Sequence, residues 1–243
     1  MLKRYRPHRR GNPRPFRGAK CGPRSSSGVT AAHRIDREWA HVHLLNDGTE
    51  LTVRMLGPED RESFLAGFAR LSPKSRYLRF FTAMPRLPDS ALRRLLDTDG
   101  IDHVALAAWR SVRGEMIEPV GVARFIRLGK GEAAEAAVAV VDHMQRRGVG
   151  RLLLADLCKA ARECGIRRFH AEVMLGNRGV GALLHELDAN AKPLAVEGDV
   201  AVYEFDVPSN AAQRPADGLL FRTRRLIARA LEVVIGRAAS RRA

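Results

Sequence analysis

Apolar and polar residues alternate through HVHLLNDGTELTVRML, residues 41–56, on both sides of Asn46-Asp47-Gly48. A period of two is typical of a half-buried strand, and Asn, Asp and Gly favour tight turns, so this stretch predicts a β-hairpin. The period then changes, because PEDRESFLAGFARL, residues 58–71, places its apolar residues three and four positions apart. That spacing predicts an amphipathic helix.

A second helix is expected directly after the first. Ser72 and Pro73 suit the N-cap and the first helical position, and the helix would continue through KSRYLRFF, residues 74–81. A third helix, bounded by proline, is expected at about 88–97. These three helices precede a part of the chain that is rich in strands.

Three β-rich runs come next, at 103–110, 119–128 and 135–142, the last of them almost wholly apolar apart from its ends. The later elements are a helix from about Gly148 to Glu163 with Gly165 as its C-cap, a strand at 167–174, a short helix at 177–187 and a strand at 199–207. A meander followed by β-loop-α-β and α-β units predicts one α/β (α+β) domain built on a mixed sheet.

Charge is unevenly distributed along the 243 residues, whose formal net charge is +15. Residues 1–37 hold 11 Lys and Arg against one acid, and residues 208–243 hold 8 against 2. Residues 38–207 hold 23 basic and 24 acidic side chains and are close to neutral. We therefore expect a disordered basic tail over 1–37 and the folded domain over 38–207. The net charge alone does not favour nucleic-acid binding by the domain itself.

The segment 208–243 differs from the first tail. Apolar residues recur at helical spacing in DGLLFRTRRLIARALEVVIG, with arginines between them, which predicts a basic amphipathic helix. Such a helix packs on its own domain or on a second copy of the chain, or contacts an anionic membrane surface or a nucleic acid. The sequence leaves these partners open, a homodimer included.

The three cysteines, Cys21, Cys158 and Cys164, form no C-x-x-C pair. An odd number without that motif argues against a disulfide framework or a zinc ribbon and fits a reducing compartment. No apolar run approaches the roughly 20 residues that cross a bilayer, and the Arg- and Pro-rich start lacks the apolar core of a secretory signal. We expect a cytoplasmic protein without a metal.

The stretch MQRRGVGRLLL, residues 144–154, joins the most apolar strand to the long helix. It lacks the P-loop pattern and the third glycine of the dinucleotide fingerprint. Its glycines nevertheless let main-chain N–H groups approach an anion, and a helix N-terminus leaves donors unpaired there. Arg146, Arg147 and Arg151 add cations, so the stretch suits a diphosphate. The alternative is a tight turn between strand and helix.

This loop, Gln145-Arg146-Arg147-Gly148-Val149-Gly150, resembles the (Q/R)-x-x-G-x-(G/A) acetyl-CoA pyrophosphate loop of GNAT N-acetyltransferases. Residues 177–189 are similar to that family's N-x-x-x-x-A-L-Y segment, with Leu184 where tyrosine is common. LSPKSRYLRFF (71–81) and GIDHVALAA (100–108) resemble the acetyltransferase domain of bacterial Pat-type protein lysine acetyltransferases.

The resemblance covers roughly residues 42–207 and implies a single GNAT-like domain. Its mixed, mostly antiparallel sheet would hold a central β-loop-α-β acetyl-CoA unit, with helices on both faces. It also implies acetyl-CoA as acyl donor, an amine acceptor such as a protein lysine, and direct attack in a ternary complex. The residues implied to bind acetyl-CoA are the main chain of Val138, Ala139 and Val140, the loop residues Gln145, Arg146, Arg147, Gly148, Val149 and Gly150, then Arg151, and Asn177 near the thioester.

Acetyl transfer needs a neutral amine, and deprotonating a lysine at pH 7 costs about 4.6 kcal/mol. Glu135 lies ten residues before Gln145, the place of the glutamate in Pat-like domains, and is the expected general base. Burial in an apolar strand is expected to raise its pKa. The alternative is a solvated charge at the end of a strand.

A general acid is harder to assign, because Leu184 replaces the usual tyrosine and His185 and Tyr77 are the remaining options. Cys158 and Cys164 are expected to be structural thiols. Two other functions stay open: a non-catalytic module that binds or senses acyl-CoA, and a protein that reaches nucleic acid or membranes through its basic tails. Nothing in the sequence names the acceptor.

Overall fold

The computed structural model describes residues 34–188 and 191–208. The expected tail up to residue 33 and the expected helix beyond residue 208 lie outside the described residues. The elements are β1 (Ala40–Leu44), β2 (Glu50–Met55), η1 (Pro58–Asp60), α1 (Arg61–Ala69), α2 (Pro73–Phe80), α3 (Asp89–Leu96), β3 (His103–Val112), β4 (Glu115–Arg127), β5 (Ala133–Val140), η2 (Asp142–Met144), α4 (Val149–Glu163), β6 (Arg168–Met174), α5 (Arg178–Leu187), β7 (Pro193–Glu197) and β8 (Val200–Asp206).

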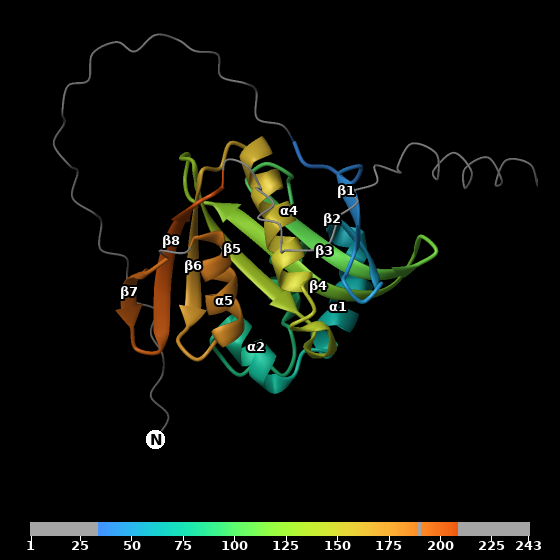
Figure 1. Ribbon diagram of the computed structural model, residues 1–243, viewed down its shortest axis with the longest axis horizontal. Helices are drawn as coiled ribbons and strands as arrows, with labels where there is room; N and C mark the ends of the chain where they lie inside the picture. Colours follow the sequence, from blue (N-terminus) through green and yellow to red (C-terminus); the bar gives the residue numbers. More distant parts are fainter. Residues whose placement is uncertain (1–33, 189–190, 209–243) are drawn as a thin grey trace, which may run out of the picture. The chain divides into compact units, whose positions relative to one another are not determined.

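One eight-stranded sheet runs in the order β1-β2-β3-β4-β5-β6-β8-β7 (Figure 1). Of its neighbouring strands only β5 and β6 are parallel, and α4 is the crossover between them. The expected mixed, mostly antiparallel sheet with a central β-loop-α-β unit is therefore confirmed. Parallel neighbours need such a crossover, whereas the remaining strands are joined as antiparallel pairs.

Helices cover both faces of the sheet. A Cβ built on Gly121 would touch Leu153 of α4 and Val140, so even-numbered side chains of β5 face α4. Ala139 instead lines a hollow together with Phe64 of α1, so odd-numbered side chains face the α1 and α2 side. The α4 face is filled by the rings of Phe125, Phe169 and Phe205, whose successive centroids lie 6.2 and 5.9 Å apart.

Several local predictions are confirmed. The hairpin β1–β2 turns at Gly48, whose φ is +81°. Ser72 caps α2, since its hydroxyl accepts a hydrogen bond from the amide of Ser75 at 3.1 Å. Gly165 follows α4 with φ +78°, the left-handed conformation that a C-cap glycine supplies. None of the described helices is long and apolar enough to cross a membrane.

Strand β7 was not predicted. All five of its residues are exposed, and it pairs with β8 alone at the edge of the sheet. A strand without a buried face has no alternation of apolar and polar residues, and Pro193 at its start reads as a break. Edge strands tolerate such a proline because their outer main-chain groups have no partner to lose.

The folded part begins before residue 38, the expected boundary. Ile35 is fully buried, and its amide donates to the carbonyl of Gly100 at 2.8 Å. A Cβ on Gly100 would lie 2.0 Å from the carbonyl oxygen of Ile35, so only glycine permits this contact. One aliphatic side chain within a basic stretch gives no periodic pattern, which is why the sequence did not reveal it.

Candidate functional site

Strands β5 and β6 separate part-way along their length. Strand β5 stays paired with β4 as far as Val140, and β6 stays paired with β8 as far as Met174. The two strands pair with each other at only three places: Ala133–Arg168, Ala134–Phe169 and Glu135–His170. Beyond Glu135 the two strands no longer pair, and Figure 1 shows them diverging on either side of α5.

A hollow lies at this opening. It is lined by residues from α2, from both strands, from α4, from α5 and from β8: Leu78, Arg79, Phe81, Glu135, Ala136, Ala137, Val138, Leu154, Ala171, Glu172, Val173, Asn177, Val180, Leu184 and Phe205. Most of these side chains are apolar, and the charged ones come from α2, β5 and β6. The separation of the strands thus produces a mainly apolar slot with a few charged groups.

The register shows which main-chain groups of β5 face the slot. The amide of Leu128 donates to the carbonyl of Ala133, and the amide of Val141 donates to the carbonyl of Val120. Main-chain groups alternate along an antiparallel strand, so odd-numbered residues of β5 bond β4 and even-numbered residues point the other way. Val138 and Val140 accordingly face the slot, whereas the polar groups of Ala139 face β4.

The loop between β5 and α4 carries two residues with positive φ. Gly148, the N-cap of α4, has φ +92°, and Arg146 has φ +59°. Residues 145–148 are exposed. The first amides of α4 have no carbonyl partner within their own helix, and they carry the positive end of the helix dipole. The loop thus places exposed residues next to the positive end of a helix.

The loop is tied to α2 through Asp142. Its carboxylate accepts hydrogen bonds from the amide of Ser72 at 2.8 Å, the hydroxyl of Ser72 at 2.6 Å and the hydroxyl of Ser75 at 3.0 Å. Burial raises the pKa of Asp142, but these hydrogen bonds outweigh it and hold the pKa below its usual value. The side-chain Nε2 of Gln145 donates to Ser75 Oγ at 3.2 Å and to the carbonyl of Val140 at 3.0 Å. Gln145 is therefore part of the same anchor.

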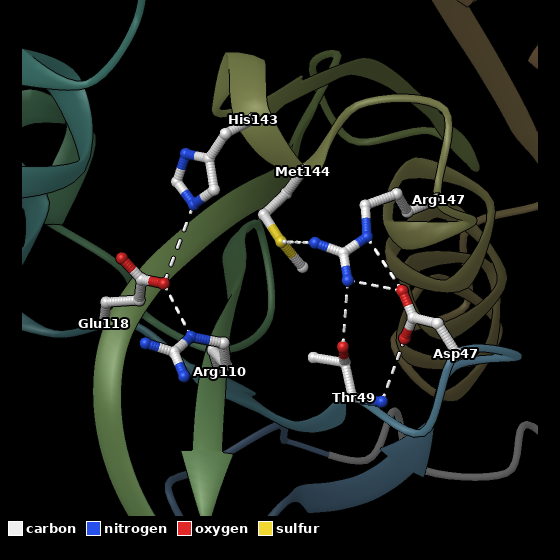
Figure 2. Close-up of polar contacts among 7 residues, drawn as sticks. All are labelled: Asp47, Thr49, Arg110, Glu118, His143, Met144 and Arg147. Atoms are coloured by element: carbon white, nitrogen blue, oxygen red, sulfur yellow. Dashed lines mark hydrogen bonds and ion pairs between the residues drawn. The ribbon is translucent and has the colours of Figure 1, made fainter.

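Arg147 is tied to the opposite side, the β1–β2 hairpin (Figure 2). Its Nε donates to Oδ2 of Asp47 at 2.9 Å, and its Nη2 contacts the same oxygen and Thr49 Oγ1. Nη1 points at the sulfur of the buried Met144, 2.9 Å away. Hydrogen bonds from Thr49 and Arg147 lower the pKa of Asp47 to about 2. The predicted role of Arg147 as a phosphate ligand competes with this structural role.

The other two arginines of the stretch differ in their surroundings. Arg151 Nε lies 3.2 Å from Glu186 Oε2 on α5, so it links α4 to α5. Arg146 is exposed, and among the described residues it has no ion pair. Of the three predicted cations, Arg146 is the one that the fold leaves ready for a ligand.

Figure 2 also shows His143 of η2 beside Glu118 and Arg110. Glu118 of β4 accepts a hydrogen bond from Arg110 Nε at 2.6 Å and lies 3.6 Å from Nε2 of His143. The hydrogen bond from Arg110 lowers the pKa of Glu118. Together with Asp142 and Arg147, this contact holds the segment before α4 from three directions.

Glu135 stands where the pairing of β5 and β6 ends, but it is exposed rather than buried. The expected burial is wrong, because its side chain points to the α2 face, where the neighbouring Ala137 and Ala139 are small. Asn177 lines the slot and caps α5 by accepting a hydrogen bond from the amide of Val180 at 3.2 Å. The structure thus brings Glu135, Val138 and Asn177 to one slot.

The remaining candidates lie less favourably. Leu184 is buried in the slot, while His185 beside it is exposed and Tyr77 is exposed on α2. Cys158 and Cys164 are buried, and burial raises their thiol pKa values to about 12 and about 11. Thiols that stay protonated are poor nucleophiles, which agrees with a structural role.

Most of the chain is similar to known proteins. The model of the acetyltransferase (GNAT) family matches residues 75–188. The chain is 31% identical over 139 residues to acetyltransferase PA5475 of Pseudomonas aeruginosa, covering 57% of this chain and 74% of that protein. The chain belongs to the GNAT acetyltransferase family. The fold is thus that of an acetyltransferase domain.

Solved GNAT structures agree with this assignment. The GNAT domain of S. lividans PAT is 34% identical and superposes with a TM-score of 0.62, covering 69% of this chain and 97% of that one. A cAMP-binding acyltransferase from Mycobacterium smegmatis is 27% identical with a TM-score of 0.51, covering 72% of this chain. The match spans 49% of that protein, so the likeness concerns about half of its length.

Two features of the site were not predicted from the sequence. One is the contact between Asp47 and Arg147, because the sequence identified Asp47 only as a residue of the hairpin turn. The other is a pair of arginines beside Glu135, namely Arg79 and Arg124. Arg79 lies in the segment that resembles Pat-type domains, but neither residue has a spacing that marks a ligand.

Proposed function

We propose that this GNAT domain is an acetyl-CoA-dependent N-acetyltransferase that transfers the acetyl group directly to an amine. The observation that carries the proposal is the unpaired edge of β5, which leads from the slot toward the loop. Pairing of β5 with β6 ends at Glu135, Val138 lines the slot, and the unpaired edge of β5 continues through Val140 toward the loop before α4. A long ligand with a diphosphate at one end and a thioester at the other matches that path.

In this proposal the diphosphate lies on the main-chain amides of residues 145–150, next to Arg146. The pantetheine arm continues into the slot as an added strand, because its amides meet the main-chain groups of Val138 and Val140 that do not bond β4. The side chains of Arg147 and Gln145 hold the loop in place through their contacts with Asp47 and Ser75, and the main chain of the loop contacts the phosphates. Ala139 contributes by pairing with β4, which keeps its two neighbours facing the slot.

The thioester then lies near Glu135 and Asn177. The amine nitrogen attacks the carbonyl carbon, the tetrahedral intermediate collapses, the C–S bond breaks, and CoA leaves as the thiolate. Glu135 accepts the proton that the nitrogen loses, directly or through a water molecule. The pKa of a CoA thiol is close to that of cysteine, near 8.5, so it leaves without an obligatory acid. No step requires a metal.

The acceptor is an amine, and the resemblance to Pat-type domains supports a protein lysine as one candidate class. The decisive experiment measures acetyl-CoA binding by calorimetry and CoA thiol release with a panel of lysine peptides, amino acids and small amines. Saturable binding with amine-dependent thiol release supports the proposal. Binding without release from any acceptor would instead identify an acyl-CoA-binding module, and no binding would remove both functions.

A further inference from the structure

Two arginines flank Glu135 on the α2 face of the sheet. Arg124 of β4 is paired with Ala137, so its side chain lies diagonally beside that of Glu135 on the same face. Arg79, in the last turn of α2, lines the slot next to Glu135. Glu135 acts electrostatically on both guanidinium groups. Three charged groups from three elements therefore converge where the pairing of β5 and β6 ends.

The two arginines lack partners in the described part of the chain. No hydrogen bond or ion pair there involves either guanidinium group, and Arg79 only lies over the ring of Phe80 at 5.1 Å. Burial lowers the pKa of Arg79 to about 10, with the charge of Arg124 adding to the effect and that of Glu135 opposing it. Burial also lowers the pKa of Arg124. The single carboxylate of Glu135 makes no ion pair with either arginine and cannot neutralise two desolvated, mutually repelling cations, which indicates a place for a further anion.

The phosphates of acetyl-CoA are not that ligand in the proposed binding mode. The loop that would hold them follows Val140, and five residues of strand separate it from Glu135, roughly 16 Å at about 3.3 Å per residue. Arg124 also points to the face opposite α4. The anion must therefore belong to the reacting end of the complex.

A second hollow begins at the same arginines. Arg79 and Arg124 line it together with aromatic and aliphatic side chains of α1, α2, β3 and β4, among them Phe64, Phe68, Phe80, Trp109 and Pro119. Arg79 lines both hollows, so it stands at their junction. Three kinds of group thus lie side by side. Glu135 suits an ammonium group, Arg79 and Arg124 suit a carboxylate, and the hollow suits an apolar side chain.

We propose that Arg79 and Arg124 bind the carboxylate of the acceptor, and that the acceptor is a free α-amino acid with an apolar side chain. This inference rests on the proposed acetyl transfer and names its acceptor class. The α-amino group and the carboxylate share one carbon atom, so both reach neighbouring charges at once. Glu135 receives the ammonium and takes its proton, while the side chain enters the apolar hollow. A lysine side chain offers no carboxylate next to its amine.

The test compares L-phenylalanine, phenylalaninamide and 2-phenylethylamine as acceptors, at equal concentrations of neutral amine. In the unaltered chain, kcat/KM for phenylalanine should exceed that for the other two by roughly 10- to 100-fold, the usual value of charge-assisted hydrogen bonds. Arg79→Gln and Arg124→Gln should each remove most of this preference by raising KM. Arg94→Gln, an exposed change on α3, should leave it intact.

Two further measurements separate failure of this inference from failure of acetyl transfer. Calorimetry of phenylalanine with CoA present tests the carboxylate site without turnover, so binding that both arginine variants lose supports the site even if no acetyl transfer occurs. The melting temperature of unliganded Arg124→Gln should rise, because an unpaired desolvated charge is gone.

Three outcomes would overturn the inference. One is acetylation of phenylalaninamide as fast as phenylalanine. Another is acetylation of lysine peptides that the arginine variants do not alter, with no phenylalanine binding. The third concerns the acyl donor, tested with 2-phenylethylamine as acceptor. If the chain prefers succinyl-CoA over butyryl-CoA and the arginine variants lose this preference, the carboxylate that the arginines bind belongs to the donor.

Discussion

Arg147 in the loop before α4 donates its Nε proton to Asp47 in the β1–β2 turn at 2.9 Å, across 100 residues of sequence. The contact joins the edge hairpin to the loop that is proposed to hold the diphosphate. Both side chains are about 40% exposed, so the pair itself adds little to global stability, within about 1 kcal/mol. Its importance is in where it holds the loop.

We therefore expect Asp47→Ala and Arg147→Ala to weaken acetyl-CoA binding by similar factors, about 3- to 10-fold, measured by calorimetry. The double variant should be no weaker than either single one, because both remove the same contact. A much larger loss for Arg147→Ala than for Asp47→Ala would show instead that Arg147 contacts the phosphates directly. Arg113→Ala, an exposed change in the β3–β4 turn, provides a control.

Gly148 and Gly165 flank α4 and offer a matched pair of substitutions. Both have positive φ, +92° and +78°, and an added Cβ would meet only Leu45 at 3.9 Å or nothing at all. Alanine at either position should lower the free energy of unfolding by about 1 kcal/mol through backbone strain. Only Gly148→Ala should weaken acetyl-CoA binding, by at least roughly 10-fold, because relief of the strain turns the loop amides away. Equal affinities in the two variants would mean that the loop does not bind the ligand.

Glu135→Gln tests the base. Loss of a positioned general base lowers kcat by about 10²- to 10⁴-fold. Acetyl-CoA affinity, measured by calorimetry, should stay unchanged, because the carboxylate lies at the far end of the slot from the loop. Glu132→Gln, an exposed neighbour before β5, serves as control. Unchanged turnover in Glu135→Gln would remove Glu135 from the mechanism.

Asp156 of α4 predicts a pH dependence of stability. Its carboxylate is fully buried and lies 2.6 Å from His43 Nε2 and 2.8 Å from Lys159 Nζ. Burial raises its pKa, but the imidazoles of His41 and His43 beside the carboxylate and the charge of Lys159 outweigh this and hold the pKa well below its usual value. A depressed folded pKa contributes stability that is present above the unfolded value, near 3.9, and is lost as pH falls below it.

Asp156→Asn should accordingly unfold more easily at pH 7, by about 2 kcal/mol, as expected for buried hydrogen bonds to a charged group. Urea titrations between pH 2 and pH 7 should also show a shallower acid limb for this variant than for the unaltered chain. An unchanged acid limb would mean that other carboxylates govern the acid sensitivity.

Local chemistry explains which parts of this fold were predictable. Gly148 and Gly165 were recognisable because positive φ favours glycine, and Ser72 because a hydroxyl before Pro73 caps a helix. Asp47 and Arg147 show the opposite case, since their meaning depends on a contact between distant segments. Glu135 shows a third, because an apolar run predicts burial on both faces, yet alanines next to the glutamate leave its side chain exposed.

The three residue pairs that join β5 to β6 divide the sheet into two unequal parts, β1 to β5 and β6, β8 and β7. Within the described residues, the two parts of the sheet are joined by that short paired stretch and by the hydrogen bonds of Arg167 and Arg168 to the carbonyl of Glu132 beside it. A ligand that pairs with β5 as an added strand would connect the two parts of the sheet. It would slow hydrogen exchange at the amides of Val138 and Val140, whereas exchange at the amides of Ala137 and Ala139, already bonded to β4, would change little. Exchange rates at alternate residues of one strand would thus report occupancy of the slot.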